Sequence, residues 1–194
     1  MRRRVALMAL GALCVLSLLA CSGGGGGGGT TTFSLAVSGS PVGARVLLNG
    51  QPVENPQSIA LPPGTHRIRV ETTLSDGQIV AQEFTVVAGA VSAVQYDLSR
   101  YRIETNPAVI EVWAGESLTV AASLRDLQTN NIIPADFVWS TRQPSIATAQ
   151  RLGSNSARIT GVSRGATRLV ITDTQTGVVF EVPVSVLDFP PPPN

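Results

Sequence analysis

The sequence predicts an all-β protein, and three observations support that class. Val, Ile and Thr, the residues that favour strands, make up more than a quarter of the chain after position 20. Apolar residues recur in steps of two rather than in the 3.6-residue period of a helix, and turn residues separate the runs. No stretch after position 20 carries a helical stripe. We expect a small antiparallel β-module over residues 33–98, followed by a β-sandwich over residues 101–188.

The N-terminus predicts a secretory signal peptide over residues 1–20. Arg2, Arg3 and Arg4 form a positive segment, and an apolar run follows from Val5 to Leu19. This run of about fifteen residues is shorter than the ~20 that a membrane-spanning helix needs. We therefore favour a cleaved signal over a permanent transmembrane anchor.

The end of this run, Leu18-Leu19-Ala20-Cys21, resembles the lipobox of bacterial lipoproteins. The resemblance implies cleavage before Cys21 and lipidation of its thiol, so that the membrane is a partner of the protein. More than one acyl chain makes such attachment stable. Ser22 follows the cysteine where inner-membrane lipoproteins carry Asp, which implies the outer membrane of the cell envelope. The alternative is an ordinary secreted protein with a stray thiol.

Residues 21–32 are expected to form a flexible tether. They contain seven consecutive glycines, Gly23 to Gly29, followed by Thr30, Thr31 and Thr32. Glycine has maximal backbone freedom and no side chain to bury, so this tract cannot pack. Its root-mean-square reach is roughly 20 Å. A phosphate-binding glycine loop would need a preceding strand, a following helix and usually a Lys, and these are missing.

The first module shows strand alternation between turns. Ile68 and Val70 alternate with Arg67 and Arg69, which predicts a strand with one buried and one solvated face. We expect His66, just after a turn, to be a solvated surface residue on the outward face. The turns are marked by Pro and Gly, and Asn49-Gly50 predicts a type I′ hairpin because both residues favour positive φ.

Three segments of this module resemble a PEGA-type domain, a small extracytoplasmic β-module. They are Gly43–Gly50, where a strand enters a hairpin, Ile59–His66, where a strand ends at a Pro-Gly turn, and Val86–Leu98, where a glycine turn precedes the last strand. The segment Leu61-Pro62-Pro63-Gly64-Thr65 stands in place of the eponymous Pro-Glu-Gly-Ala. The resemblance implies a scaffold or binding surface without catalysis.

The second module resembles a group 2 bacterial Ig-like domain, the type found in tandem in intimin-like and invasin-like adhesins. The motifs occur in the family's order: Asn106–Val112, Ala114–Val120, Val138–Thr141, Ser145–Thr148, Ile159–Val162, Gly165–Thr167 and Leu169–Ile171. The resemblance implies a sandwich whose core contains Trp139, and it implies adhesion as one function.

Two features depart from that family's pattern. The segment Gln128 to Pro134 is expected to be a polar loop, and Pro183 lies inside the last strand, where it cannot donate a ladder hydrogen bond. We therefore expect that strand to lie at a sheet edge or to carry a bulge. Only Ser99 and Arg100 separate the modules, which should touch. Residues 189–194 are expected to form a Pro-rich tail.

Composition excludes several functions. All 14 basic residues are Arg, they are scattered, and the formal net charge is +1, which does not fit a nucleic-acid binder. The single histidine and the spread acids supply no nucleophile–base pair and no zinc ligand set, so we expect no enzyme, no cofactor and no metal site. Calcium at Asp126, Asp136 or Asp173, and a carboxylate pair matched only in space, stay open alternatives.

We expect the chain to act as a non-catalytic, membrane-anchored envelope lipoprotein that serves as a surface adhesive, ligand-binding or spacer module. The alternative is a structural accessory subunit of a periplasmic or outer-membrane assembly that engages a protein partner through a strand edge. Trp113, which precedes a glycine turn, and Tyr101, at the module junction, are the candidate binding-surface residues. The alternative is that Trp113 packs in the core or at the junction and that Tyr101 packs at the junction. The partner would be a protein or a polysaccharide.

Overall fold

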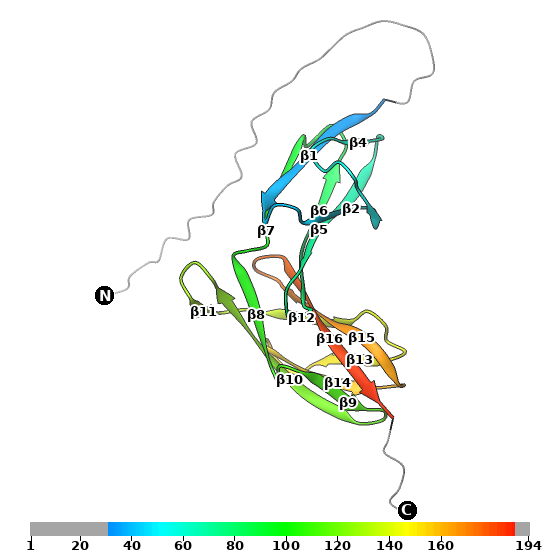
Figure 1. Ribbon diagram of the computed structural model, residues 1–194, viewed down its shortest axis with the longest axis vertical. Coiled ribbons are helices and arrows are strands. Elements are labelled where there is room, and N and C mark those ends of the chain that lie inside the picture. Colours follow the sequence, from blue (N-terminus) through cyan, green and yellow to red (C-terminus); the bar gives the residue numbers. More distant parts are fainter. Residues whose placement is uncertain (1–30, 189–194) are drawn as a thin grey trace, which may run out of the picture. The chain divides into compact units, whose positions relative to one another are not determined.

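The computed structural model describes residues 31–188, and every regular element in that range is a β-strand (Figure 1). The all-β prediction is confirmed. The predicted signal peptide, Cys21, nearly all of the predicted tether and the Pro-rich tail lie outside the described residues. Within residues 31–188 there is no helix that is long and apolar enough to cross a membrane.

The first seven strands form two sheets that face each other. Their bounds are β1 (Phe33–Ser40), β2 (Arg45–Leu48), β3 (Gln51–Pro52), β4 (Ile59–Leu61), β5 (Thr65–Thr73), β6 (Ile79–Val87) and β7 (Ala93–Asp97). One sheet has the order β4-β1-β7, and the other begins β3-β2-β5-β6. β1 and β7 pair in parallel, a difference from the antiparallel module that we expected. The long connection through β2 to β6 makes this parallel pairing possible.

The predicted hairpin at Asn49-Gly50 is confirmed. Asn49 has a φ of 49° and Gly50 a φ of 86°, as a type I′ turn requires, and the turn joins β2 to β3.

The prediction for His66 is wrong. Its side chain is buried, with 8% exposed, because the period of two that buries Ile68 and Val70 also turns His66 inward. Its Nε2 donates to the carbonyl oxygen of Pro62 at 2.8 Å, and its Nδ1 accepts from the side-chain amide of Asn49 at 3.2 Å. His66 therefore braces the hairpin from inside the fold.

The other nine strands form a β-sandwich. Their bounds are β8 (Tyr101–Asn106), β9 (Ile110–Trp113), β10 (Ser117–Asp126), β11 (Asn131–Ile133), β12 (Phe137–Thr141), β13 (Ala147–Arg151), β14 (Ser156–Gly161), β15 (Gly165–Asp173) and β16 (Val178–Leu187). One sheet has the order β11-β10-β14-β13, with β8 on β10. The other has the order β12-β15-β16, with β9 parallel to β16.

The segment Gln128 to Pro134 is not the plain loop that we expected. It contains β11, which pairs antiparallel with the end of β10 so that Asp126 lies opposite Asn131. Asn130 takes a φ of 58° at the turn, a conformation that asparagine tolerates better than most residues. The polar composition hid the strand because it lies at a sheet edge, where its side chains are exposed or half-buried.

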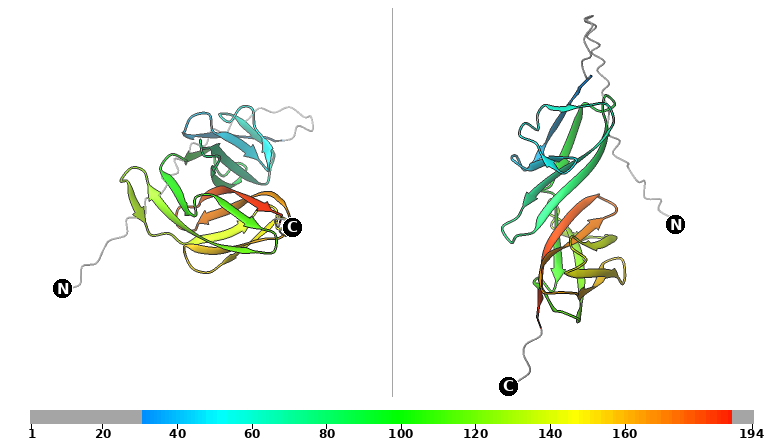
Figure 2. Two further views of the ribbon diagram at one scale, coloured as in Figure 1. Left: turned by 60° about the horizontal axis from the view of Figure 1, so that its bottom comes forward. Right: turned by 90° about the vertical axis from the view of Figure 1, so that its right-hand side faces the viewer.

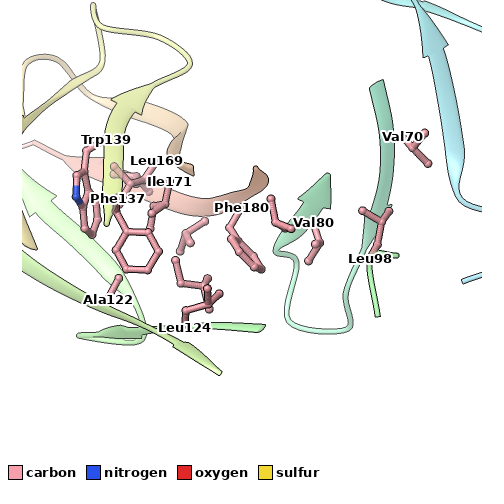
Figure 3. Close-up of a cluster of buried hydrophobic side chains, with 14 of the residues drawn as sticks. Val70, Val80, Leu98, Ala122, Leu124, Phe137, Trp139, Leu169, Ile171 and Phe180 are labelled. Atoms are coloured by element: carbon pink, nitrogen blue, oxygen red, sulfur yellow. The ribbon is translucent and has the colours of Figure 1, made fainter. Parts of the chain in front are cut away.

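Trp139 lies in the core of the sandwich, as predicted, with 7% of its surface exposed. It packs edge-on against Phe137, with ring centroids 5.9 Å apart and an interplanar angle of 81° (Figure 3). Its indole Nε1 is buried and has no hydrogen-bond partner among residues 31–188. This part of the core therefore depends on apolar packing rather than on polar contacts.

The two groups of strands share one sheet. β6 of the first group pairs antiparallel with β16 of the second, which joins the strands into an eight-stranded sheet (Figure 1). Figure 2 shows the orange and red strands of the sandwich beside the ends of β5 and β6. We call the place where β6 pairs with β16 the crossing. There Phe180 lies opposite Val80, and both are fully buried in one continuous core (Figure 3). Whether residues 33–98 and 101–188 are separate domains stays a prediction.

Pro183 does not lie in an edge strand, because β16 has neighbours on both sides. The amide of Arg142 donates to the carbonyl oxygen of Arg168, so the backbone of Arg168 faces β12 and not β16. Its register partner Pro183 therefore points its nitrogen toward the opposite side. On that side the pairing with β6 ends at Glu181 and the pairing with β9 begins at Val184. Pro183 thus occupies a fork where no ladder bond is lost.

Removing the aromatic ring at the crossing should weaken the whole fold. We expect Phe180→Ala to lower the free energy of unfolding by about 3–5 kcal/mol, because it leaves a cavity between both groups of strands. Val138→Ala, at a half-exposed position in β12, should change it by less than ~0.5 kcal/mol. Urea unfolding of the two variants checks this, and equal midpoints would contradict the shared core.

Candidate functional site

A charged cluster covers the crossing on the face opposite Phe180. Arg69 of β5 lies at its centre, and its guanidinium contacts Glu71 at 2.7 Å, Glu83 at 2.9 Å and Glu181 at 2.5 Å. Glu181 comes from β16, so this contact joins residues 112 positions apart. Only 4% of the Glu181 side chain and 13% of the Arg69 side chain are exposed.

A second arginine completes the cluster. Arg142, which follows β12, also donates to Glu181. Burial would raise the pKa of Glu181, but the hydrogen bond and charge of Arg142, together with those of Arg69, lower it below its ordinary value of 4.5. Burial likewise opposes the ionisation of Glu83, and its bonds to Arg69 and Arg67 nevertheless lower its pKa. The carboxylates are therefore held ionised by the arginines beside them.

This cluster stabilises the crossing rather than offering a reactive group. Glu181 is buried between two guanidinium groups, and the guanidinium of Arg69 donates hydrogen bonds to three carboxylates. Burial would lower the pKa of Arg69, but hydrogen bonds to Glu71 and Glu83 raise it above its ordinary value. Breaking such a buried network costs more than the network contributes by itself, because one charge is left unpaired.

The lowered pKa values of Glu181 and Glu83 predict acid sensitivity. Their contribution to stability is fully present above pH ~4.5, the unfolded value, and is lost as the pH falls through the lower folded values. We expect the urea midpoint to be nearly flat from pH 7 to pH 6 and to fall steeply below pH ~4.5.

Glu181→Gln provides the matched test. At pH 7 it should destabilise the protein by about 3–5 kcal/mol, because it leaves Arg69 and Arg142 without their shared counterion. Its midpoint should also depend less on pH than that of the unchanged protein. A variant that keeps the same acid dependence would show that other carboxylates cause it.

A cavity of about 510 Å³ lies at the fork in the sheet. It is bounded by the turn after β5, by β8, by the start of β9 and by β16 around Pro183. The apolar side chains on its walls include Ile103, Val109 and Val182. Val109 stands at 70% exposure, so it lies at the rim, whereas Ile103 is fully buried. The cavity exists because β6 and β9 leave a gap along β16.

Polar groups of the cavity come from both groups of strands. Arg102 of β8 contacts Asp76 of the turn at 2.7 Å. Gln78 donates its backbone N–H to the Asp76 side chain, and its own side-chain Oε1 is buried without a hydrogen-bond partner among the described residues. The cavity thus combines an apolar wall, an ion pair and an acceptor that lacks a donor.

The structure places the two predicted surface residues far apart. Trp113 ends β9, 39% exposed, beside Leu187 of β16. Tyr101 begins β8, half-buried, with the guanidinium of Arg100 at 5.0 Å from its ring centroid. Tyr101 lies opposite Asp126, the last residue of β10, whereas Trp113 lies just before Ser117, the first residue of β10. The length of β10, roughly 30 Å, therefore separates Tyr101 from Trp113. They are separate candidates, and neither lines the cavity.

The three aspartates considered for calcium have structural partners. Asp126 accepts from the backbone of Gln128 and from Arg100, and Asp173 accepts from the N–H and hydroxyl of Thr176. Asp136 contacts Arg151. Among residues 31–188 no group of three His, Cys, Asp or Glu side chains is placed to hold a metal.

Sequence reasoning missed both the cluster and the cavity. The run Arg67, Arg69 and Glu71 was visible as a charged strand face, but nothing in the sequence indicated that Glu181 would cover it. The signal for the cavity was Pro183, a proline within a strand pattern. Proline leaves one backbone position of a strand without a hydrogen-bond donor, but the sequence does not show which strands lie beside that position.

Comparisons with known proteins yield fold likeness only. No protein-family model matches the chain, and no curated protein matches it. Among solved structures, the S-layer protein SbsC domains 4 and 5 match at 18% identity and a TM-score of 0.38, over 67% of this chain and 69% of that chain.

Longer pieces of the same S-layer protein also match. SbsC domains 1–6 align at 19% identity and a TM-score of 0.40, over 76% of this chain and 20% of that chain. Domains 4–9 align at 20% identity and a TM-score of 0.39, over 81% of this chain and 24% of that chain. At these values the likeness supports no statement about function.

Proposed function

We propose that this chain is a non-catalytic lipoprotein of the cell envelope, lipidated at Cys21 and anchored in the outer membrane, whose β-strand body acts as an adhesive, ligand-binding or spacer module. The observation that carries the proposal is the order of segments at the N-terminus: three arginines, an apolar run, Leu-Leu-Ala-Cys and a glycine tract. The PEGA-like and Ig-like resemblances agree with it and remain predictions.

The environment of the polar side chains supports a non-catalytic role. Both ring nitrogens of His66 are occupied by hydrogen bonds inside the fold, so His66 is not available as a general base. Glu181 is enclosed by Arg69 and Arg142. Asp173 is fully buried and accepts bonds from its own turn. These groups perform structural tasks.

The joined sheet supports a spacer or presenting role. Hydrogen bonds between β6 and β16, the buried Phe180 and the Arg69–Glu181 contact hold the two groups of strands together. A surface placed on such a body keeps its position relative to the rest of the body.

One observation favours the second candidate function, an accessory subunit that engages a protein partner. β8 pairs on one side only within the described residues, and the other side runs along the cavity. An unpaired strand edge is a typical place for another strand to add. Tyr101 and Thr105 on this strand are half-buried, and Ile103 between them is fully buried, so a partner could reach the strand only near its two ends.

The proposed lipidation of Cys21 predicts that a variant without this thiol loses its membrane attachment. Cys21→Ala should abolish acyl labelling and release the chain from membranes, because the thioether is the anchor in this proposal. Deletion of Gly23–Gly29 is the matched control and should leave both labelling and membrane retention intact. Cell fractionation with metabolic acyl labelling checks both variants. Retention of unlabelled Cys21→Ala in membranes would contradict the lipoprotein assignment.

Protease accessibility separates the two candidate functions. If the body is an adhesive or ligand-binding module, protease added to intact cells should digest it. If it is a periplasmic accessory subunit, digestion should begin only after the outer membrane is permeabilised. A periplasmic protein and a known surface protein, followed in the same samples, give the controls.

A further inference from the structure

A second hollow, of about 380 Å³, lies beside the charged cluster, on the face of the shared sheet opposite Phe180. Its walls come from β15, from Pro183 of β16 and from the two residues that follow β12, Arg142 and Gln143. Arg168 of β15 is a second arginine in these walls. The volume of the hollow is that of a site for a small ligand.

The two arginines stand opposite each other on neighbouring strands. The amide of Arg142 donates to the carbonyl oxygen of Arg168 at 2.9 Å, one position beyond the register pair of Thr141 and Leu169. Side chains in opposite positions of an antiparallel pair lie on the same face, with Cβ atoms about 5 Å apart. Two like charges in such positions destabilise the pair unless an anion compensates them.

Within residues 31–188, only Arg142 of this pair has a carboxylate partner, which is Glu181. Arg168 is half-buried, and its Nη1 donates to the carbonyl oxygens of Gly77 at 2.9 Å and of Glu181 at 3.4 Å. These are neutral acceptors, and no hydrogen bond within the described residues uses its Nε or Nη2. Arg168 is thus a cation without a counterion whose free donors belong to the wall of a hollow.

Positive charge is in excess on this face. Glu181 is already shared between Arg69 and Arg142, so it does not compensate Arg168. The charged cluster and Arg168 together hold five arginines and three glutamates, which gives a net charge of +2: Arg45, Arg67, Arg69, Arg142 and Arg168 against Glu71, Glu83 and Glu181. Such an excess beside a hollow attracts anions.

We propose that this hollow binds the phosphate group of a phosphate monoester, held by the guanidinium groups of Arg142 and Arg168. Each guanidinium presents its N–H groups as a planar fork that fits two oxygens of an anion. A carboxylate has two oxygens and one charge. A phosphate monoester has three free oxygens and about two negative charges above pH ~7, so it matches both forks and the net charge of the face.

The remaining walls fit the other parts of such a ligand. Gln143 is exposed, and its side-chain amide is a further donor at the hollow. Ala166 and Pro183 are exposed apolar residues of the same walls, against which the organic part of the ester would lie. The proposal gives a ligand class to the ligand-binding role proposed above. It does not depend on lipidation at Cys21, so either proposal can fail without the other.

The experiment is a calorimetric titration of the full chain, purified in a nonionic detergent and kept at constant ionic strength. The probe is methyl phosphate at pH ~7.5, where it carries about two charges. Dimethyl phosphate, a diester with two free oxygens and one charge, is the comparison. We expect saturable binding of methyl phosphate and an affinity for dimethyl phosphate about tenfold lower. No saturable binding of methyl phosphate, or equal affinity for the diester, would overturn the proposal.

Arg168→Gln removes the uncompensated charge and keeps an amide that can donate to Gly77. It should lower the affinity for methyl phosphate about tenfold. Arg158→Gln is the matched control, because Arg158 of β14 is exposed and also contacts no carboxylate within residues 31–188, but lies opposite Thr119 and Gln150 instead of a second arginine. It should leave the affinity unchanged. Equal losses in both variants would mean unspecific attraction and would refute a site at Arg168.

Ala166→Glu tests the hollow without removing either arginine. Residue 166 lies two positions from Arg168 on the same strand face, so the new carboxylate should supply the missing counterion and occupy the place of the phosphate. We expect this variant to lose methyl phosphate binding while its urea midpoint stays at least as high as that of the unchanged chain. Circular dichroism checks that every variant is folded. Undiminished binding by Ala166→Glu would contradict the proposal even if Arg168→Gln failed to fold.

Discussion

The pairing of β6 with β16 is the constraint on which the rest of the structure depends. Along four residues of each strand it joins the sheet of the first group of strands to that of the sandwich. One face of this short ladder is apolar, where Phe180 meets Val80, and the other is charged, where Glu181 meets Arg69. Because the ladder has few hydrogen bonds, the stability of this junction depends on the side chains packed on its two faces.

The two faces contribute differently. The apolar face gains stability with contact area and is insensitive to pH, whereas the charged face depends on every member staying ionised. A buried ion pair is weak evidence for stability by itself, but it penalises any arrangement that leaves Glu181 unpaired. The cluster thus selects one register of β6 against β16, while the packing of Phe180 contributes stability that does not depend on pH.

Sequence patterns were sufficient where a local rule decides the structure. The alternation along β5, the hairpin at Asn49-Gly50 and the buried Trp139 follow from period, φ preference and size. His66 was misjudged although the same alternation placed it inside. The contact between Arg69 and Glu181 and the fork at Pro183 could not be predicted, because each depends on which strands become neighbours far apart in the sequence.

The position of β16 bears on the export that we propose for this chain. It is the last strand along the described residues, yet it is the neighbour of β6, β9 and β15. A chain that crosses a membrane N-terminus first cannot pair β6 with β16 until Glu181 has emerged, nor β9 with β16 until Leu187 has emerged. Both pairings span long stretches of chain. In the export that we propose, the contact that joins the two groups of strands is therefore among the last to form.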